Sequence, residues 1–120
     1  MTLPVALVVE DDALLRMSAM MMVEDAGFAA VGARNAEEAI TLLEDRADIF
    51  LIFTDVDMGS GKDGLWLAFQ VRDRWPPVHI IIVTSGHRHV TADMLPADAL
   101  FFGKPYLDDQ VIGAMKRLAA

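Results

Sequence analysis

Short, nearly continuous apolar runs alternate with segments of helical periodicity along the chain. The runs are Val5–Val9, Phe28–Val31, Ile49–Phe53, His79–Val83 and Ala99–Phe102. Strands with apolar residues at successive positions are buried on both faces, which is typical of a parallel sheet covered by helices. Parallel strands need right-handed crossovers, and the helical segments supply them. The pattern therefore predicts an α/β fold, a doubly wound three-layer sandwich around a five-stranded parallel sheet.

Capping residues locate the helices between these runs. The first helix is expected to start near Asp12 and to end before Gly27, a residue suited to the left-handed position after a helix end. Asn35, followed three residues later by Glu38, indicates a capping box and a second helix that ends near Asp45. Three more helices are expected: at 64–75 after the capping residue Asp63, at 90–95 where Pro96 keeps the helix short, and at 107–118 where apolar residues share one face.

Length and charge limit the class of protein. A chain of 120 residues can bury one core, so residues 1–120 are expected to form a single domain. The net charge of -8, from 18 acidic and 10 basic residues, argues against nucleic acid or a membrane surface as a partner. No apolar run approaches the roughly 20 residues of a membrane span, and the first residues lack the positive leader of a signal peptide. Zero cysteines exclude disulfides and thiolate metal sites. We therefore expect a cytoplasmic protein.

Reactive side chains follow the carboxyl ends of four of the five expected strands. Ligands of open parallel sheets bind at these ends, where the strand order reverses. In a sheet of order 2-1-3-4-5 the first and third strands are neighbours, so Glu10, Asp11 and Asp55 should crowd together. The full set is Glu10, Asp11 and Asp12 after the first strand, Asp55 and Asp57 after the third, Thr84 and Ser85 after the fourth, and Lys104 after the fifth.

The chemistry of this set suits phosphoryl transfer. Three carboxylates at close range stay ionised only if a cation lies among them, and oxygen ligands without cysteine or a nearby histidine favour a hard ion such as Mg²⁺. Lys104 adds a fixed positive charge from the other side. A carboxylate nucleophile, a bridging metal and an ammonium together can transfer a phosphoryl group. The Thr84 hydroxyl could donate to a phosphoryl oxygen, and the small Ser85 would leave room for the group.

Four short segments carry a resemblance to a known family: the acidic pair in VVEDD, the acceptor in LIFTDVDM, the hydroxyl in IIVTSG and the lysine-proline in FFGKPY. With these segments in this order, the chain resembles the receiver domain of two-component response regulators over essentially its whole length. The resemblance implies a flavodoxin-like fold in which Asp55 takes a phosphoryl group from a sensor histidine kinase or a histidine phosphotransfer protein. It implies that Mg²⁺ is held by Asp11, Asp55 and the backbone carbonyl of Asp57, with Glu10 acting through water.

The resemblance also implies a conformational switch. Thr84 and Phe101 would move together on phosphorylation, and the Lys104–Pro105 bond would be cis. The reshaped face would bind a downstream protein target, or a second copy of the chain as a homodimer, through residues 90–95, 99–102 and 107–118. Such a protein is no metabolic enzyme, because it catalyses only its own phosphorylation and dephosphorylation. With no output domain expected, it is either a stand-alone receiver or a receiver from a hybrid kinase.

The sequence departs from the commonest receivers at three positions. Gly59 stands where many receivers have proline, Phe101 stands where tyrosine is common, and Asp57 adds a carboxylate two positions beyond the acceptor. We expect the Asp57 side chain to change the rate of dephosphorylation, in a direction that the sequence does not set.

Three other functions compete with this interpretation. The segment GSGKDG at 59–64 matches the G-x-G-x-x-G of dinucleotide-binding loops, but two aspartates precede it. About 20 residues further on stands His79 and not an acid for the ribose. Asp55-Val56-Asp57 resembles the D-x-D motif of haloacid-dehalogenase phosphatases, which belongs on a first strand. A degenerate receiver that acts only as an interaction module stays open.

Several of these residues also have simpler explanations. Glu10 and Asp12 could favour a helix N-terminus, and Phe101 could be a core aromatic residue. The methionines at 17, 20, 21 and 22 are expected to pack a helix and not to bind a soft metal. His87 and His89 have no carboxylate partner at ligand spacing, so we expect solvated loop residues.

Overall fold

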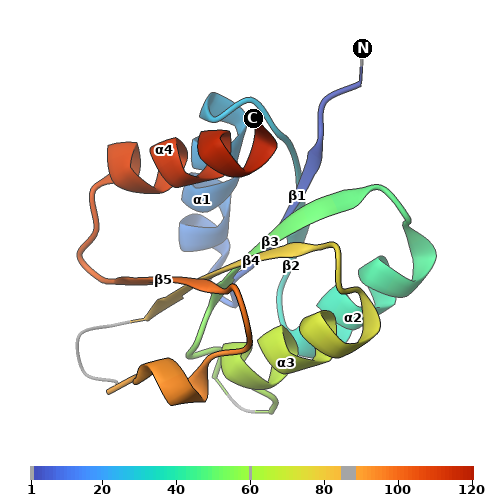
Figure 1. The fold of residues 1–120 in the computed structure, drawn as a ribbon, viewed down its shortest axis with the longest axis vertical. Helices are drawn as coiled ribbons and strands as arrows, with labels where there is room; N and C mark the ends of the chain where they lie inside the picture. Colours follow the sequence, from blue (N-terminus) through green and yellow to red (C-terminus); the bar gives the residue numbers. More distant parts are fainter. Residues whose placement is uncertain (1, 60, 85–88) are drawn as a thin grey trace.

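A parallel sheet forms the centre of the fold in the computed structural model, which describes residues 2–59, 61–84 and 89–120. The five strands run in the order β2-β1-β3-β4-β5, which confirms the predicted topology (Figure 1). All four neighbouring pairs are parallel. The strands are β1 (Val5–Val9), β2 (Ala29–Ala33), β3 (Ile49–Asp55), β4 (His79–Thr84) and β5 (Leu100–Gly103).

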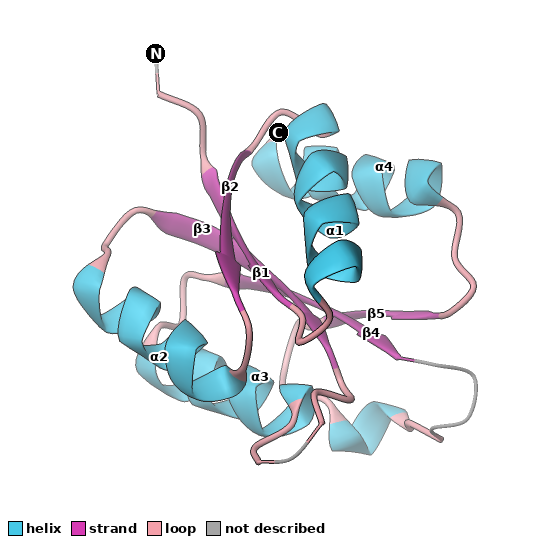
Figure 2. Cartoon of the chain, turned by 180° about the vertical axis from the view of Figure 1, so that it is seen from behind, coloured by secondary structure: helices cyan, strands magenta, loops and turns pink. Residues whose placement is uncertain are grey.

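Two helices cover each face of this sheet (Figure 2). Helices α1 (Ala13–Asp25) and α4 (Asp108–Ala119) lie on one face, and α2 (Ala36–Asp45) and α3 (Gly64–Arg74) lie on the other. Successive strand residues point to opposite faces: Leu7 and Val9 pack toward α2 and α3, whereas Val8 packs toward α1 and α4. Both faces are therefore buried, as the unbroken apolar runs predict.

The predicted caps start the helices where the sequence indicates. The Asp12 carboxylate accepts 2.9 Å hydrogen bonds from the N–H groups of Leu14 and Leu15. Asp12 is therefore the N-cap of α1, the simpler of the two roles considered for it. The Asn35 side chain accepts from the Glu38 N–H at 2.8 Å. The Glu38 carboxylate accepts from the Arg34 N–H and not from Asn35, so the expected capping box is displaced by one residue.

The cap of α3 and the end of α1 also match their predicted residues. The Asp63 carboxylate accepts from the Trp66 N–H at 2.8 Å and caps α3 as expected. Gly27 has φ 97°, the left-handed conformation expected after a helix.

Helix packing accounts for Met20, which is half-buried, and for Met22, which is buried, but Met17 and Met21 are exposed on α1.

The segment at 90–95 differs most from its prediction. It contains only the 3₁₀ turn η1 (Ala92–Met94), because Pro96 leaves too few residues for an α-helix to repeat its hydrogen bonds. Strand β3 extends two residues beyond its predicted end, which makes Asp55 a strand residue paired with Val83. Strand β2 is displaced by one to two residues toward Ala33, and α4 begins at Asp108, one residue late.

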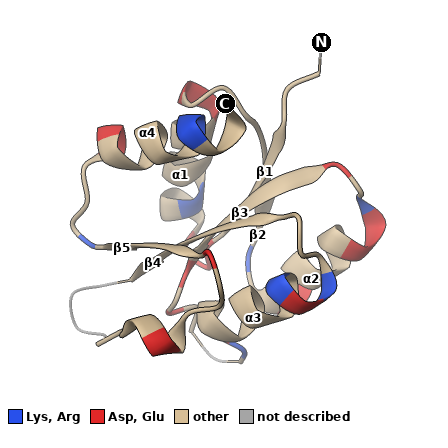
Figure 3. Ribbon diagram, viewed as in Figure 1, with Lys and Arg blue, Asp and Glu red and all other residues tan. Residues whose placement is uncertain are grey.

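Basic residues are distributed along the described parts of the chain. Figure 3 shows the described Lys and Arg residues scattered among the helices and strand ends. Within the described ranges there is no helix with the length and apolar character to cross a membrane.

Candidate functional site

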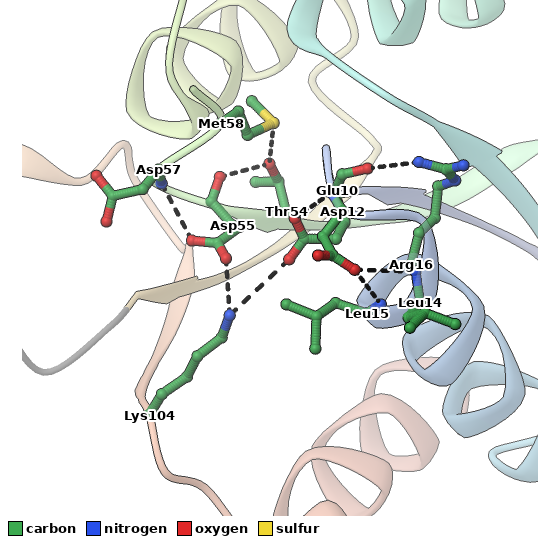
Figure 4. Close-up of polar contacts among 10 residues, drawn as sticks. All are labelled: Glu10, Asp12, Leu14, Leu15, Arg16, Thr54, Asp55, Asp57, Met58 and Lys104. Atoms are coloured by element: carbon green, nitrogen blue, oxygen red, sulfur yellow. Dashed lines mark hydrogen bonds and ion pairs between the residues drawn. The ribbon is translucent and has the colours of Figure 1, made fainter. Parts of the chain in front are cut away.

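Three charged side chains meet at the carboxyl ends of β1, β3 and β5 (Figure 4). The ammonium Nζ of Lys104 lies 2.7 Å from Oδ2 of Asp55 and 3.9 Å from Oε1 of Glu10. The two carboxyl groups are buried: Asp55 is 8% exposed and Glu10 is 6% exposed. The strand order thus brings together residues that are 45 and 49 positions apart in the chain, as the sequence predicts.

The backbone fixes the orientation of the Asp55 carboxylate. Oδ1 accepts a 3.0 Å hydrogen bond from the Asp57 N–H, while Oδ2 contacts Lys104. The Val56 N–H donates to the Val83 carbonyl at 2.8 Å, so pairing of β3 with β4 continues beyond Asp55. The Lys104–Pro105 bond is cis, as expected.

Burial and neighbouring charges change the ionisation of the site. Burial raises the pKa of Glu10 to about 7, and a hydrogen bond with Asp11 and the charge of Asp55 act in the same direction. Burial lowers the pKa of Lys104, but the hydrogen bond to Asp55 and the charges of Asp55 and Glu10 outweigh it, so the pKa is raised overall. Without a bound cation, Glu10 is therefore about half protonated at pH 7, and a cation among these carboxyls would favour its charged form.

A hard cation fits this charge and these donors, although the described residues contain no closed group of three acidic or histidine ligands. The available donors are oxygens, which suit Mg²⁺. The expected crowding of Glu10, Asp11 and Asp55 is only partly realised, because the Lys104 ammonium stands between two of these carboxyls. Oδ2 of Asp11 faces the loop after β3, 3.2 Å from where a side-chain carbon on Gly59 would lie.

Thr84 and Phe101 lie on neighbouring strands at the same end of the sheet. Thr84 ends β4 and is 2% exposed, and its hydroxyl is a buried side-chain group without a hydrogen-bond partner among the described residues. Phe101 of β5 is half-buried and pairs with Ile82. Ser85 and His87 lie outside the described residues, and His89 is exposed.

A cavity of about 340 Å³ opens beside the charged cluster. Its polar side includes Glu10, Asp55 and Lys104, and its apolar side includes Leu15, Met22 and Tyr106. Sequence reasoning missed Tyr106, whose ring packs edge-on against Phe53 with centroids 6.4 Å apart. Its place directly after the lysine-proline pair is the one signal that could have found it.

Sequence reasoning also missed the role of Gly64. A side-chain carbon at Gly64 would lie 2.0 Å from the Asp55 carbonyl oxygen, so only glycine allows the start of α3 to approach this strand so closely. The Gly64 N–H donates to the Val56 carbonyl at 2.9 Å. Gly59 and Gly61 have φ of 68° and 102°, which explains the glycine-rich loop without a phosphorylated cofactor.

Comparison with known proteins assigns the family. The family model of the response regulator receiver domain matches residues 6–115, so this chain belongs to the response regulator receiver domain family. The chain is 28% identical over 115 residues to sensor kinase CckA of Brucella abortus (strain 2308), covering 93% of this chain and 12% of that protein. It is 27% identical over 120 residues to the putative response regulator NtrX-like of Rickettsia bellii, covering 98% of this chain and 25% of that protein. The chain therefore spans a quarter or less of the length of these relatives.

Solved structures show the same fold. A response regulator receiver protein from Sinorhizobium medicae has a TM-score of 0.84 and 26% identity, covering 95% of this chain and 92% of that one. The response regulator protein TrrA from Thermotoga maritima, in complex with Mg(2+)-BeF, has a TM-score of 0.83 and 25% identity, covering 98% and 99%. These structures agree with the flavodoxin-like topology of the sheet.

Proposed function

We propose that this chain is the phosphoacceptor of a two-component phosphorelay and that Asp55 is the residue phosphorylated. The observation that carries the proposal is the position of the Asp55 carboxylate, buried at the end of β3 and held by the Lys104 ammonium at 2.7 Å. A fixed cation next to a carboxylate nucleophile stabilises the charge that develops on a transferring phosphoryl group. Family membership and the Mg(2+)-BeF complex of TrrA support the same chemistry.

Each residue has a defined part in this reaction. An Asp55 carboxylate oxygen forms a bond to phosphorus while the P–N bond of the donor phosphohistidine breaks, and the imidazole leaves. Lys104 holds the negative charge of the phosphoryl oxygens. Asp11, Asp55 and the backbone carbonyl of Asp57 would hold Mg²⁺, with Glu10 acting through water. Bound there, Mg²⁺ would supply positive charge to neutralise the phosphoryl oxygens.

The Thr84 hydroxyl, which has no hydrogen-bond partner among the described residues, supports a switch. A buried hydroxyl without a partner costs about 1–3 kcal/mol, and donation to a phosphoryl oxygen on Asp55 would recover that free energy. We propose that Thr84 moves toward the phosphoryl group and that Phe101 moves with it. Phosphorylation adds about -1.5 to -2 charges, and the two-state movement converts this charge into a new surface.

The proposed partners follow from this role. A sensor histidine kinase or a histidine phosphotransfer protein supplies the phosphoryl group, and a downstream protein target or a second copy binds the face formed by η1, β5 and α4. The chain would act in the cytoplasm, as a stand-alone receiver or as part of a longer protein. It would catalyse only its own phosphorylation and dephosphorylation.

Intact-mass spectrometry after incubation with Mg²⁺ and acetyl phosphate tests the proposal. We expect the mass of one phosphoryl group to be added to the wild-type protein and to be absent in Asp55→Asn. Asp48→Asn is the matched control, because Asp48 is an exposed aspartate at the other end of β3. No adduct with either acetyl phosphate or a phosphorylated histidine donor would contradict the proposal and favour an interaction module.

We further propose that the Asp57 carboxylate alters the lifetime of the phosphoryl group. The backbone N–H of Asp57 donates to the Asp55 carboxylate, so the Asp57 side chain begins close to the reacting group. The decay of phosphorylated Asp57→Asn, followed by intact mass, should differ from that of the wild type. Equal decay rates would remove this role.

A further inference from the structure

Arg16 contacts the acidic end of β1 from the first turns of α1. Its Nη1 donates a 3.0 Å hydrogen bond to the backbone carbonyl of Glu10 (Figure 4). Glu10 is the first residue after β1, and its own N–H donates to the Ala33 carbonyl at 3.0 Å. The Glu10 carboxylate accepts from the Asp12 N–H at 3.1 Å. Arg16 therefore fixes one of three points that hold Glu10 where the chain leaves the sheet.

A glycine in β2 makes room for the Arg16 side chain. Gly32 pairs with Val8 in the sheet, and a side-chain carbon there would lie 3.3 Å from Cδ of Arg16 and 2.9 Å from Sδ of Met20. Contacts this short are rare, so any larger residue would displace both side chains. The second strand thus contributes space to the site, although its end has no reactive side chain.

We propose that Arg16 is a positioning residue that aims the Glu10 and Asp11 carboxyls toward Asp55, and that Gly32 provides the space this requires. The inference rests on the proposed function, in which these carboxyls hold Mg²⁺. The Glu10 carbonyl belongs to the peptide that joins Glu10 to Asp11, so a hydrogen bond to this oxygen sets the direction in which Asp11 leaves the strand. Outer residues that orient metal ligands in this way contribute strongly to metal affinity.

A second role for Arg16, as a simple counter-charge, makes the opposite prediction. Among the described residues Arg16 forms no ion pair with a carboxylate, and its guanidinium donates to a neutral carbonyl. Removing a nearby positive charge alone would strengthen Mg²⁺ binding, because the carboxyls would lose a competing cation. Removing a positioning contact would weaken it. The sign of the change therefore separates the two roles.

Calorimetric titration of Mg²⁺ into wild type, Arg16→Gln and Arg16→Lys tests the proposal. We expect the dissociation constant to rise about tenfold in Arg16→Gln. Arg16→Lys keeps the charge but loses the planar fork of donors, so it should also bind Mg²⁺ more weakly than the wild type. Arg46→Gln is the matched control, since Arg46 pairs with Asp48 at the opposite end of the sheet and should change the constant less than twofold. Unchanged or tighter Mg²⁺ binding by Arg16→Gln would overturn the proposal.

Gly32→Ala provides a second test with the arginine still present. Because both substitutions disturb the same contact, the loss of Mg²⁺ affinity in Arg16→Gln/Gly32→Ala should be smaller than the sum of the two single losses. If the double variant loses as much Mg²⁺ affinity as the two single variants added together, the shared role is contradicted. An absence of Mg²⁺ binding by the wild type would also contradict it. Circular dichroism checks that each variant folds. If the wild type is phosphorylated but Arg16→Gln binds Mg²⁺ as tightly as the wild type, only the positioning role of Arg16 is rejected. If the wild type is not phosphorylated, the proposed phosphoacceptor function is rejected, whatever the titration shows.

Discussion

Replacement of Gly64 by alanine should destabilise the protein, although helix propensity predicts the reverse. Gly64 is the first residue of α3, where alanine is favoured over glycine by up to about 1 kcal/mol. The added carbon would lie 2.0 Å from the Asp55 carbonyl oxygen, 2.8 Å from the Asp55 carbonyl carbon and 3.0 Å from Cα of Val56. All three are backbone atoms, so no side-chain rotation can relieve the overlap.

The sizes of these effects decide the sign. Overpacking costs about 1–3 kcal/mol, and the upper end applies where the backbone itself must move. Movement of α3 would also weaken the hydrogen bond from the Gly64 N–H to the Val56 carbonyl, which contributes about 1 kcal/mol. After subtraction of the propensity gain, the free energy of unfolding should fall by about 3 kcal/mol. For an m-value near 2 kcal/mol/M, the urea midpoint should fall by about 1.5 M.

Urea unfolding followed by circular dichroism measures this change, and Gly113→Ala is the matched control. A side-chain carbon at Gly113, within α4, would meet only Nη1 of Arg117 at 3.4 Å, the end of a flexible side chain. Gly113→Ala should therefore stabilise the protein by about 0.5–1 kcal/mol. Phosphorylation of Asp55 should slow in Gly64→Ala only, because the strand end must shift. Equal or greater stability of Gly64→Ala with an unchanged phosphorylation rate would refute the reasoning.

Three further predictions concern the charged cluster and the nearby Thr84 hydroxyl. The Glu10 carboxyl has a pKa of about 7 in the folded protein and about 4.5 in the unfolded protein. The free energy of unfolding of the Mg²⁺-free protein should therefore fall by about 3 kcal/mol as the pH rises from 4.5 to 7. Thermal melts at several pH values should show this decrease, and Glu10→Gln should lack it. Lys104→Met should slow phosphorylation of Asp55 by at least about tenfold, whereas exposed Lys116→Met should not; equal rates by mass spectrometry would contradict the role. Thr84→Val should raise the urea stability of the unphosphorylated protein by about 1 kcal/mol, because it removes a buried hydroxyl that has no partner among the described residues; a loss of stability would show that the hydroxyl has a partner.

The sequence predicted the elements because burial and capping leave local patterns. Unbroken apolar runs report strands buried on both faces, and Asp12, Asn35 and Asp63 report helix starts through hydrogen bonds that span two or three residues. The order 2-1-3-4-5, assumed for a sheet of this kind and observed in the structure, placed Glu10 and Asp55 at one edge of the sheet.

The segment at 90–95 shows the limit of this reasoning. A helical prediction there depended on only a few residues before Pro96, too few for periodicity to separate an α-helix from a single turn. The structure shows η1 alone. The capping partner of Glu38 shows the same limit, because the sequence pattern predicts the Asn35 N–H whereas the carboxylate accepts from the Arg34 N–H.

By itself the sequence determined which residues lie within about two positions of the strand ends, because each strand is a local feature and all parallel strands end at the same edge. Only the tertiary structure decided which atoms meet there: Lys104 with Oδ2 of Asp55, Arg16 with the Glu10 carbonyl, and Gly64 with the Asp55 backbone. These contacts depend on the paths of loops and on close approach between backbones, which have no periodicity. The space that Gly64 leaves beside the Asp55 backbone likewise arises only when distant segments pack together.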